Sequence, residues 1–275
     1  MPIEFRLEIS KLLRKPRTYI GPVAISALVV IALVAVKYGN EFRGIENRLA
    51  QDFILAGSFR NAAFLTRFML LEFVVYMLLP VFVCIVFGDL VASEVADGTL
   101  RMLLCRPITR FRLLTSKYFV GTIYACVLTY GMGLLAYLLG FVFLGRGSLV
   151  NLADGIWVLP ERIALLRLAV TYGLTALGMI AIGSIAFAIS TFLSNSNGAV
   201  AGALGFVIGS GIIGQLDFFR WLKPYLLTSY LEVGRFIVGK PDIALFVKSV
   251  CVMLMYSIVA FVVGALIFQK RDVLS

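Results

Sequence analysis

Residues that could do chemistry are few in this chain. It has no histidine, which removes the commonest metal ligand and proton shuttle. Its four cysteines, Cys84, Cys105, Cys126 and Cys251, lie far apart, so neither a zinc site nor a disulfide framework is indicated. No pattern pairs a nucleophile with a base. We therefore predict no catalytic residue, no metal ligand and no cofactor-binding residue, and we interpret the chain as a non-catalytic protein.

One motif has the spacing of a phosphate-binding loop. Gly234-Arg-Phe-Ile-Val-Gly239-Lys240 fits the pattern G-x-x-x-x-G-K, but Pro241 stands where a serine or threonine would ligate Mg²⁺. Three bulky apolar residues also crowd the loop, and a proline followed by an apolar run is a poor start for a phosphate-cradling helix. We interpret this motif as a chance match.

The composition predicts a membrane protein. Of 275 residues, 61% are hydrophobic, whereas soluble domains contain about 45–50% apolar residues. The net charge of +10 comes from basic residues in short loops beside apolar runs, which favours an anionic membrane surface over nucleic acid. We predict one all-α domain over residues 1–275, with six spans that each suit the ~20 residues needed to cross a bilayer. These spans are residues 19–36, 68–87, 118–144, 168–192, 198–216 and 249–268.

The N-terminal segment predicts both an interfacial helix and an orientation. Residues 3–15 place apolar side chains on one face and charged ones on the other, and Pro16 should end the helix before the first span. Such a helix would lie in the interface near anionic lipid, or it would serve only as an orientation signal. Five basic residues precede the first span, and six spans return the chain to the same side. We therefore predict that both termini are cytoplasmic in the cytoplasmic (inner) membrane.

Two features within the spans could carry more than packing. Small residues at Gly198, Gly202, Gly205 and Gly209 share one helical face, which predicts close helix packing within the subunit or in a dimer, with a substrate role as the alternative. Glu72 lies one turn inside the second span, where an ionisable group suggests a functional polar site. The alternative for Glu72 is that its carboxylate reaches back to the interface.

The stretch ASEVADGTLRMLLCRPITR, residues 92–110, places five charges between two apolar runs. We expect the second span to end at Gly88 and Asp89 to be the N-cap of a new amphipathic helix over residues 90–106. Pro107 should stop that helix, and Thr109 should cap the next one. From the pattern alone, this helix either lies on the bilayer or receives force from a soluble partner.

The segment GDLVASEVADGTLRMLLCRPITRFRLLTSK resembles the segment after the second span in type-2 ABC exporter permeases. The resemblance rests on a Glu, a Gly-Thr, a leucine pair, a Pro, an Arg and a Lys that opens the third span. One departure is Arg101, where an acidic residue is expected. The matching positions are Glu94, Gly98, Thr99, Leu103, Leu104, Pro107, Arg110 and Lys117.

This resemblance implies a permease that works as a homodimer in membrane lipid and exports a substrate. Hydrolysis would belong to a separate cytosolic ABC ATPase that docks on the amphipathic helix, termed the coupling helix. We assign the docking surface to Glu94, Asp97, Gly98, Thr99, Arg101, Leu103, Leu104, Pro107 and Arg110, and we expect charge reversal at Glu94 to leave folding intact. The alternative is a non-transporting component that transmits ATPase motion to a periplasmic or extracellular factor, as in nitrous oxide reductase maturation. An ATP-independent channel is less favoured, because the spans contain few polar residues.

Overall fold

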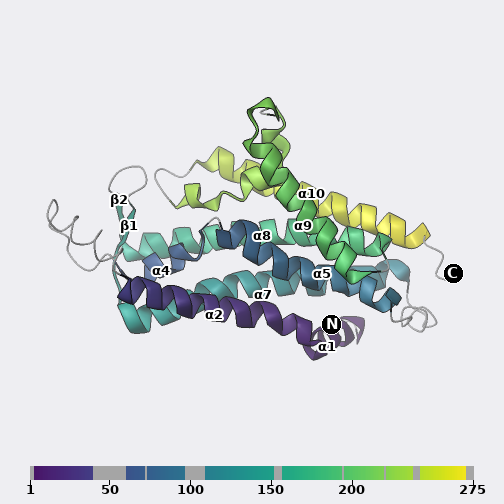
Figure 1. The fold of residues 1–275 in the computed structure, drawn as a ribbon, viewed down its shortest axis with the longest axis horizontal. Helices are drawn as coiled ribbons and strands as arrows, with labels where there is room; N and C mark the ends of the chain where they lie inside the picture. Colours follow the sequence, from purple (N-terminus) through teal and green to yellow (C-terminus); the bar gives the residue numbers. More distant parts are fainter. Residues whose placement is uncertain are drawn as a thin grey trace.

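The protein is predominantly helical (Figure 1). The computed structural model describes residues 3–39, 60–71, 73–96, 109–151, 157–193, 195–219, 221–237 and 242–270. Within these residues, six helices are long and apolar enough to cross a membrane, which indicates a multi-pass membrane protein. They are α2 (Pro16–Tyr38), the continuous run of η1 (Val74–Leu78) and α5 (Leu79–Ala96), α7 (Arg110–Leu144), α8 (Glu161–Phe192), α9 (Ser196–Gln215) and α10 (Ile243–Lys270).

Most predicted spans are confirmed, but their helices extend further than the apolar runs. The third predicted span begins at Tyr118, whereas α7 begins two turns earlier at Arg110. Thr109 caps α7 as predicted, because its side chain accepts a hydrogen bond from the Arg112 backbone N–H at 3.4 Å. A span predicted from hydropathy ends at the first charged residue, whereas the helix continues for as long as its backbone hydrogen bonds and caps allow.

The second predicted span, residues 68–87, is wrong at both ends. Its first residue belongs to a separate short helix, α4 (Ala62–Phe68), and the long helix begins at Val74. At the other end, α5 runs straight through Gly88 and Asp89 to Ala96, so Asp89 is not an N-cap. A side chain at Gly88 would meet Val200 of α9 at 3.0 Å. Close helix packing therefore explains this glycine, and it does not mark a helix end.

The π-helical turn η1 precedes a proline. Pro80 has no N–H with which to continue the normal pattern, and the Leu79 N–H bonds to Val74 O five residues back. Such widened turns accommodate a proline within a helix. Tyr76, within η1, donates its hydroxyl hydrogen to Thr228 O at 3.0 Å and so ties this turn to a neighbouring loop.

One end of the bundle carries small elements that the apolar pattern did not predict. Asn61 caps α4 and also donates from Nδ2 to Ser148 O at 2.7 Å, beside the hairpin of β1 (Leu149–Asn151) and β2 (Trp157–Leu159). A methyl group at Gly140 would lie 2.8 Å from Ala62 Cα, so α4 and α7 approach closely there. The structure also has 3₁₀ turns from residue 217 onward. They are η2 (Asp217–Phe219), η3 (Lys223–Tyr225), η4 (Leu227–Tyr230) and η5 (Val233–Phe236).

The core forms around α8, which packs against α5, α7, α9 and α10. At its centre the Phe87 ring meets Phe187 edge-on, with 6.5 Å between ring centroids. A side chain at Gly183 or Gly121 would overlap the Phe87 ring. These two glycines therefore make room for a large buried aromatic side chain, which is the role that small residues play where helices pack closely.

The helix α9 contacts the bundle through a face other than the predicted glycine face. Its buried residues are Ala199, Ala203, Val207 and Ser210. A methyl group at Gly198 or Gly202 would meet Leu193 or Ile189, at 3.2 and 3.4 Å respectively. At Gly205 and Gly209 it would meet no atom of the described residues within 4 Å. Close packing of those two glycines against a second copy stays a prediction.

A helix, α1 (Ile3–Arg14), is present over most of the predicted residues 3–15, and Pro16 is the first residue of α2. The location of α1 at a membrane interface stays a prediction. Figure 1 places α1 and the C-terminal end of α10 at the same end of the bundle, opposite the hairpin of β1 and β2. A contact supports this placement, because Arg110 Nη1 lies 3.3 Å from Gln269 O. Residues 97–108, which join α5 to α7, lie outside the described residues.

Candidate functional site

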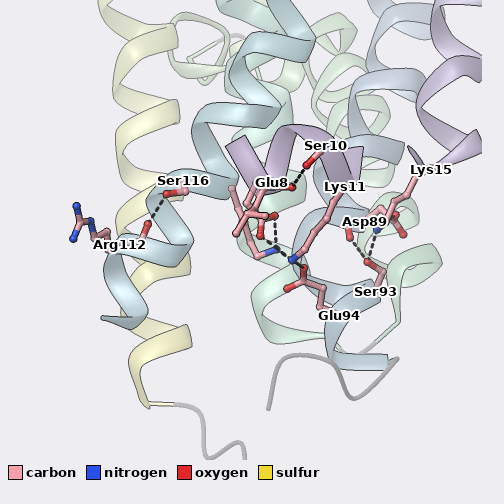
Figure 2. A network of polar contacts seen from close by, with 11 residues as sticks. Glu8, Ser10, Lys11, Lys15, Asp89, Ser93, Glu94, Arg112 and Ser116 are labelled. Atoms are coloured by element: carbon pink, nitrogen blue, oxygen red, sulfur yellow. Dashed lines mark hydrogen bonds and ion pairs between the residues drawn. The ribbon is translucent and has the colours of Figure 1, made fainter. Parts of the chain in front are cut away.

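Charged side chains from three helices converge where α1 crosses the end of α5 and the start of α7. Figure 2 shows Glu8 and Lys11 of α1 directed toward Glu94 of α5, with Lys15, Asp89 and Ser93 in a second group beside them. We refer to Glu8, Lys11, Glu94 and Lys117 as the ion-pair cluster. These groups lie at the ends of apolar helices, where charges are rare and usually paired.

The ion-pair cluster is a closed ring of two lysines and two glutamates. Lys117 Nζ lies 2.9 Å from Glu8 Oε2 and 2.8 Å from Glu94 Oε1. Lys11 Nζ lies 3.0 Å from Glu8 Oε1 and 2.9 Å from Glu94 Oε1. Each cation therefore touches both anions, and the ring has no net charge. Residues 83 and 109 positions apart in the sequence meet directly in these contacts.

The two lysines differ in burial. The side chain of Lys117 is 2% exposed, whereas that of Lys11 is 41% exposed. Moving an ammonium group out of water costs several kcal/mol of free energy unless anions and hydrogen bonds compensate for the lost hydration. Lys117 is thus held in the protein by Glu8 and Glu94, whereas Lys11 forms the solvent-facing side of the ring.

Lys11 remains protonated at neutral pH. Burial alone would lower the pKa of Lys11, but hydrogen bonds and charge interactions with Glu94 and Glu8 outweigh it and raise its pKa above the usual value. The stabilisation from this raised pKa is fully present below the ordinary lysine pKa. It is lost only as the pH rises through the higher value of the folded protein. Lys11 therefore does not act as a pH switch in the physiological range.

A second group joins the start of α2 to α5. Lys15 Nζ lies 2.7 Å from Asp89 Oδ2 and 2.8 Å from Ser93 Oγ, and Arg17 Nη1 lies 3.3 Å from Asp89 Oδ1. Asp89 and Ser93 are four residues apart and so share one face of α5. Because Lys15 lies at the break between α1 and α2, these bonds hold that corner against α5.

The local sequence explains why these side chains meet. Glu8 and Lys11 are three residues apart on α1 and face the same way. Pro16 starts a new helix, so α1 leaves the direction of α2 and can cross the bundle end. Asp89 and Glu94 lie on α5 beyond the point where the apolar run stops. The charges therefore occupy helix turns that lie outside the predicted apolar spans.

The arrangement suits a mechanical connection between helices. The cavity that the charged residues line has a volume of about 30 Å³, enough for one or two waters. Among the described residues, no group of three or more His, Cys, Asp and Glu side chains could hold a metal ion. The ion pairs of the ring connect α1, α5 and α7 at this end of the bundle.

Comparison with known proteins identifies a family. Residues 26–274 match the family described as "Protein of unknown function (DUF2705)". The chain belongs to the DUF2705 family. Within the match lie Asp89, Glu94 and Lys117, whereas α1, with Glu8 and Lys11, precedes it.

A relative of this DUF2705 chain occurs in Bacillus subtilis (strain 168), under the name "Uncharacterized protein YhcI". The two are 27% identical over 208 residues, which is 72% of this chain. The match spans 65% of the length of that relative, so this chain covers slightly less than two thirds of it.

The predicted docking residues of this DUF2705 chain divide into two sets. Glu94 is 8% exposed and belongs to the ion-pair cluster, so its carboxylate faces the protein interior. Arg110 begins α7 and contacts α10. The other seven lie outside the described residues: Asp97, Gly98, Thr99, Arg101, Leu103, Leu104 and Pro107. Glu72, predicted as a polar site within a span, also lies outside them.

The placement of Glu94 corrects one expectation. Charge reversal there was expected to spare folding, because residue 94 was assigned to a loop helix outside the spans. In the structure Glu94 belongs to α5, and a lysine in its place would face Lys117 and Lys11. Like charges at this distance in a poorly hydrated site repel strongly. Glu94→Lys should therefore destabilise the folded protein, so a loss of ATPase binding in this variant would not by itself report on docking.

Sequence reasoning missed the cluster although each member was visible. Glu8 and Lys11 were assigned to the polar face of an interfacial helix, and Lys117 was noted only as the lysine that opens the third span. The sequence did contain a signal: the acidic Glu94 follows the second apolar run, and the basic Lys117 directly precedes the third. Charges in such positions are usually paired.

Proposed function

We propose that this chain is the transmembrane permease subunit of an ATP-driven exporter of the type-2 ABC class. Two copies would pair in the cytoplasmic membrane, with both termini in the cytoplasm. A separate cytosolic ABC ATPase would dock on the segment between α5 and α7 and hydrolyse ATP. The permease would provide the transport path and the mechanical connection to it.

One observation carries this proposal: the two helices that flank residues 97–108 are joined to each other and to α1 by buried ion pairs. Glu94 lies three residues before that segment, and Lys117 lies nine residues after it. A push on the segment would therefore move α5, α7 and α1 together. A loop that only connects two spans has no need of such an anchor, whereas a docking segment that receives force does.

The docking test substitutes the segment itself and leaves the cluster intact. We expect a Gly98→Leu, Leu103→Asp double variant to insert and fold, because both positions lie between the second and third predicted spans. Bulk and an unpaired charge at a closely fitting contact should reduce ATPase binding by roughly tenfold or more. The tagged chain is purified from its own host, and bound ATPase is measured by mass spectrometry and by ATP hydrolysis per permease.

A matched control is Gly211→Leu in α9. A side chain at Gly211 meets no atom of the described residues within 4 Å, so it adds the same bulk away from the docking segment. This control should retain the ATPase. If the double variant retains as much ATPase as Gly211→Leu, or if the wild type binds none, the exporter proposal loses its support.

Orientation has its own prediction. Residues 37–63, 146–162 and 217–242 should face the outside, and residues 194–198 the cytoplasm, because basic residues precede the first span. Ser148 is exposed beside the hairpin at the end of the bundle opposite α1. A Ser148→Cys variant lacking the native cysteines should therefore react with a membrane-impermeant maleimide in intact spheroplasts. Labelling that requires permeabilised membranes would reverse the orientation.

A further inference from the structure

A second hollow lies between α1, α2 and α7, and its lining is almost entirely apolar. It has a volume of about 350 Å³, within the ~300–1,000 Å³ range of small-molecule sites. Its walls come from α1, α2 and α7, which lie along one side of the bundle (Figure 1). Representative lining residues are Leu13 of α1, Ile25 of α2 and Val127 of α7. We call this hollow the α1–α2–α7 groove.

The groove opens toward the surroundings of the bundle. Val127 is 63% exposed, and Tyr19 and Ile123 are also exposed. Because α2 and α7 are long and apolar enough to span a membrane, surface exposed between them would face acyl chains. No side chain of the described residues fills the groove, since a methyl group at Gly131 would meet nothing within 4 Å.

The two ends of the groove differ in chemistry. Along α7 the lining runs from Val120 to Leu135, which is roughly 22 Å at the rise of an α-helix. That length exceeds the ~15 Å half-thickness of a hydrocarbon core. At one end α1 crosses, held to α2 by hydrogen bonds from Thr18 Oγ1 to Leu12 O at 2.7 Å and from Tyr19 OH to Leu13 O at 2.9 Å. The groove thus starts at an amphipathic helix and is long enough to cover the depth of one leaflet.

The end at α1 is positively charged. Arg6 lies three and seven residues before Ile9 and Leu13, two groove-lining residues, and so shares their face of the helix. Arg6 and Arg14 are both exposed. Among the described side chains of α1, the acid Glu8 does not cancel this charge, because it is neutralised by Lys11 and Lys117 within the ion-pair cluster. Basic residues that border an apolar groove suit an anionic headgroup above an acyl chain.

We infer that the α1–α2–α7 groove binds one acyl chain of an anionic phospholipid, with its phosphate near Arg6 and Arg14. The lipid would fill the space between α1 and α7 and would hold the N-terminal helix at the interface. This site requires no ATPase and no transport, so it stands apart from the proposed function. The groove is distinct from the ion-pair cluster, although Leu12 borders both.

The test counts bound lipid on the full chain by native mass spectrometry in detergent. Phosphatidylglycerol and phosphatidylcholine with identical acyl chains are added in turn. We expect the wild type to retain phosphatidylglycerol in preference to phosphatidylcholine. Gly131→Leu should fill the groove and lose both lipids, and Gly211→Leu in α9 is the matched control that should lose neither. Val127→Trp is a second filling variant, at an exposed position where bulk does not disturb the core.

The headgroup is tested separately. An Arg6→Gln, Arg14→Gln variant should lose roughly tenfold or more of its preference for phosphatidylglycerol, while phosphatidylcholine binding stays unchanged. Unchanged phosphatidylglycerol retention in a folded filling variant would overturn the site. So would an undiminished preference in the arginine variant. Disulfide formation between two copies of an Ile123→Cys variant would show that a second protein chain, and not lipid, covers the groove.

Discussion

Lys117→Ala should remove most of the folded protein. The substitution leaves the carboxylates of Glu8 and Glu94 buried and adjacent, and the cation of the ion-pair cluster that still faces them is the partly exposed Lys11. Removing one partner of a buried ion pair costs about 3–5 kcal/mol, which is a large part of the stability of a typical domain. The measurement is the yield of monodisperse protein in detergent, together with the temperature at which it unfolds.

Two comparison variants separate burial from charge. Lys11→Ala removes the same charge from a side chain that is 41% exposed, and exposed ion pairs contribute only about 0–1 kcal/mol. A Glu8→Gln, Glu94→Gln, Lys117→Met variant keeps no buried charge in the cluster, because the one charge left belongs to Lys11, whose side chain is 41% exposed. This variant should recover much of the loss. An unfolding temperature of Lys117→Ala equal to that of the wild type would mean that the cluster does not join the helices.

Gly140→Ala should be the most damaging glycine-to-alanine change in α7 that does not involve an aromatic side chain. The added methyl group would lie 2.8 Å from Ala62 Cα, and a backbone atom cannot turn aside as a flexible side chain can. Forcing α4 away from α7 should cost about 1–3 kcal/mol, as overpacking does elsewhere. Thermal unfolding in detergent measures this loss, and limited proteolysis near α4 should rise with it.

The matched control lies on the same helix. Gly131→Ala adds the same methyl group where no atom of the described residues lies within 4 Å. Alanine is the better helix former by about 1 kcal/mol, so this variant should be as stable as the wild type or more stable. If both variants shift the unfolding temperature equally, the effect belongs to helix propensity and not to the contact between α4 and α7.

These predictions concern two different ends of α7. Lys117 lies near its start, within the ion-pair cluster, and Gly140 lies near its end, against α4. Between them, α7 borders the α1–α2–α7 groove. The helix is therefore fixed at both ends and offers an open apolar surface in the middle. A permease that transmits force from one side of the membrane would need a rigid element of this kind.

Close contacts between helices could not be predicted from the pattern within one helix, because each contact also involves residues that are far away in the sequence. Glycine spacing in α9 predicted a packing face, yet the buried face of α9 consists of alanine, valine and serine. Glycines that do admit a neighbour closely include Gly121, Gly140 and Gly183, which lie on two other helices, α7 and α8. A pattern within one helix indicates which residues are small, but the partner helix decides which of them it meets.

Local patterns in the sequence were enough to predict the number and order of the long helices. They also predicted the amphipathic N-terminal helix with its break at Pro16 and the cap at Thr109. These follow from local properties: the length of apolar runs, the missing N–H of proline and a side-chain hydrogen bond within one turn. The inward orientation of Glu94 could be seen only once the helices were packed together. Its partners, Lys11 and Lys117, come from two other helices, and a charge can be buried only where such partners compensate for its lost hydration.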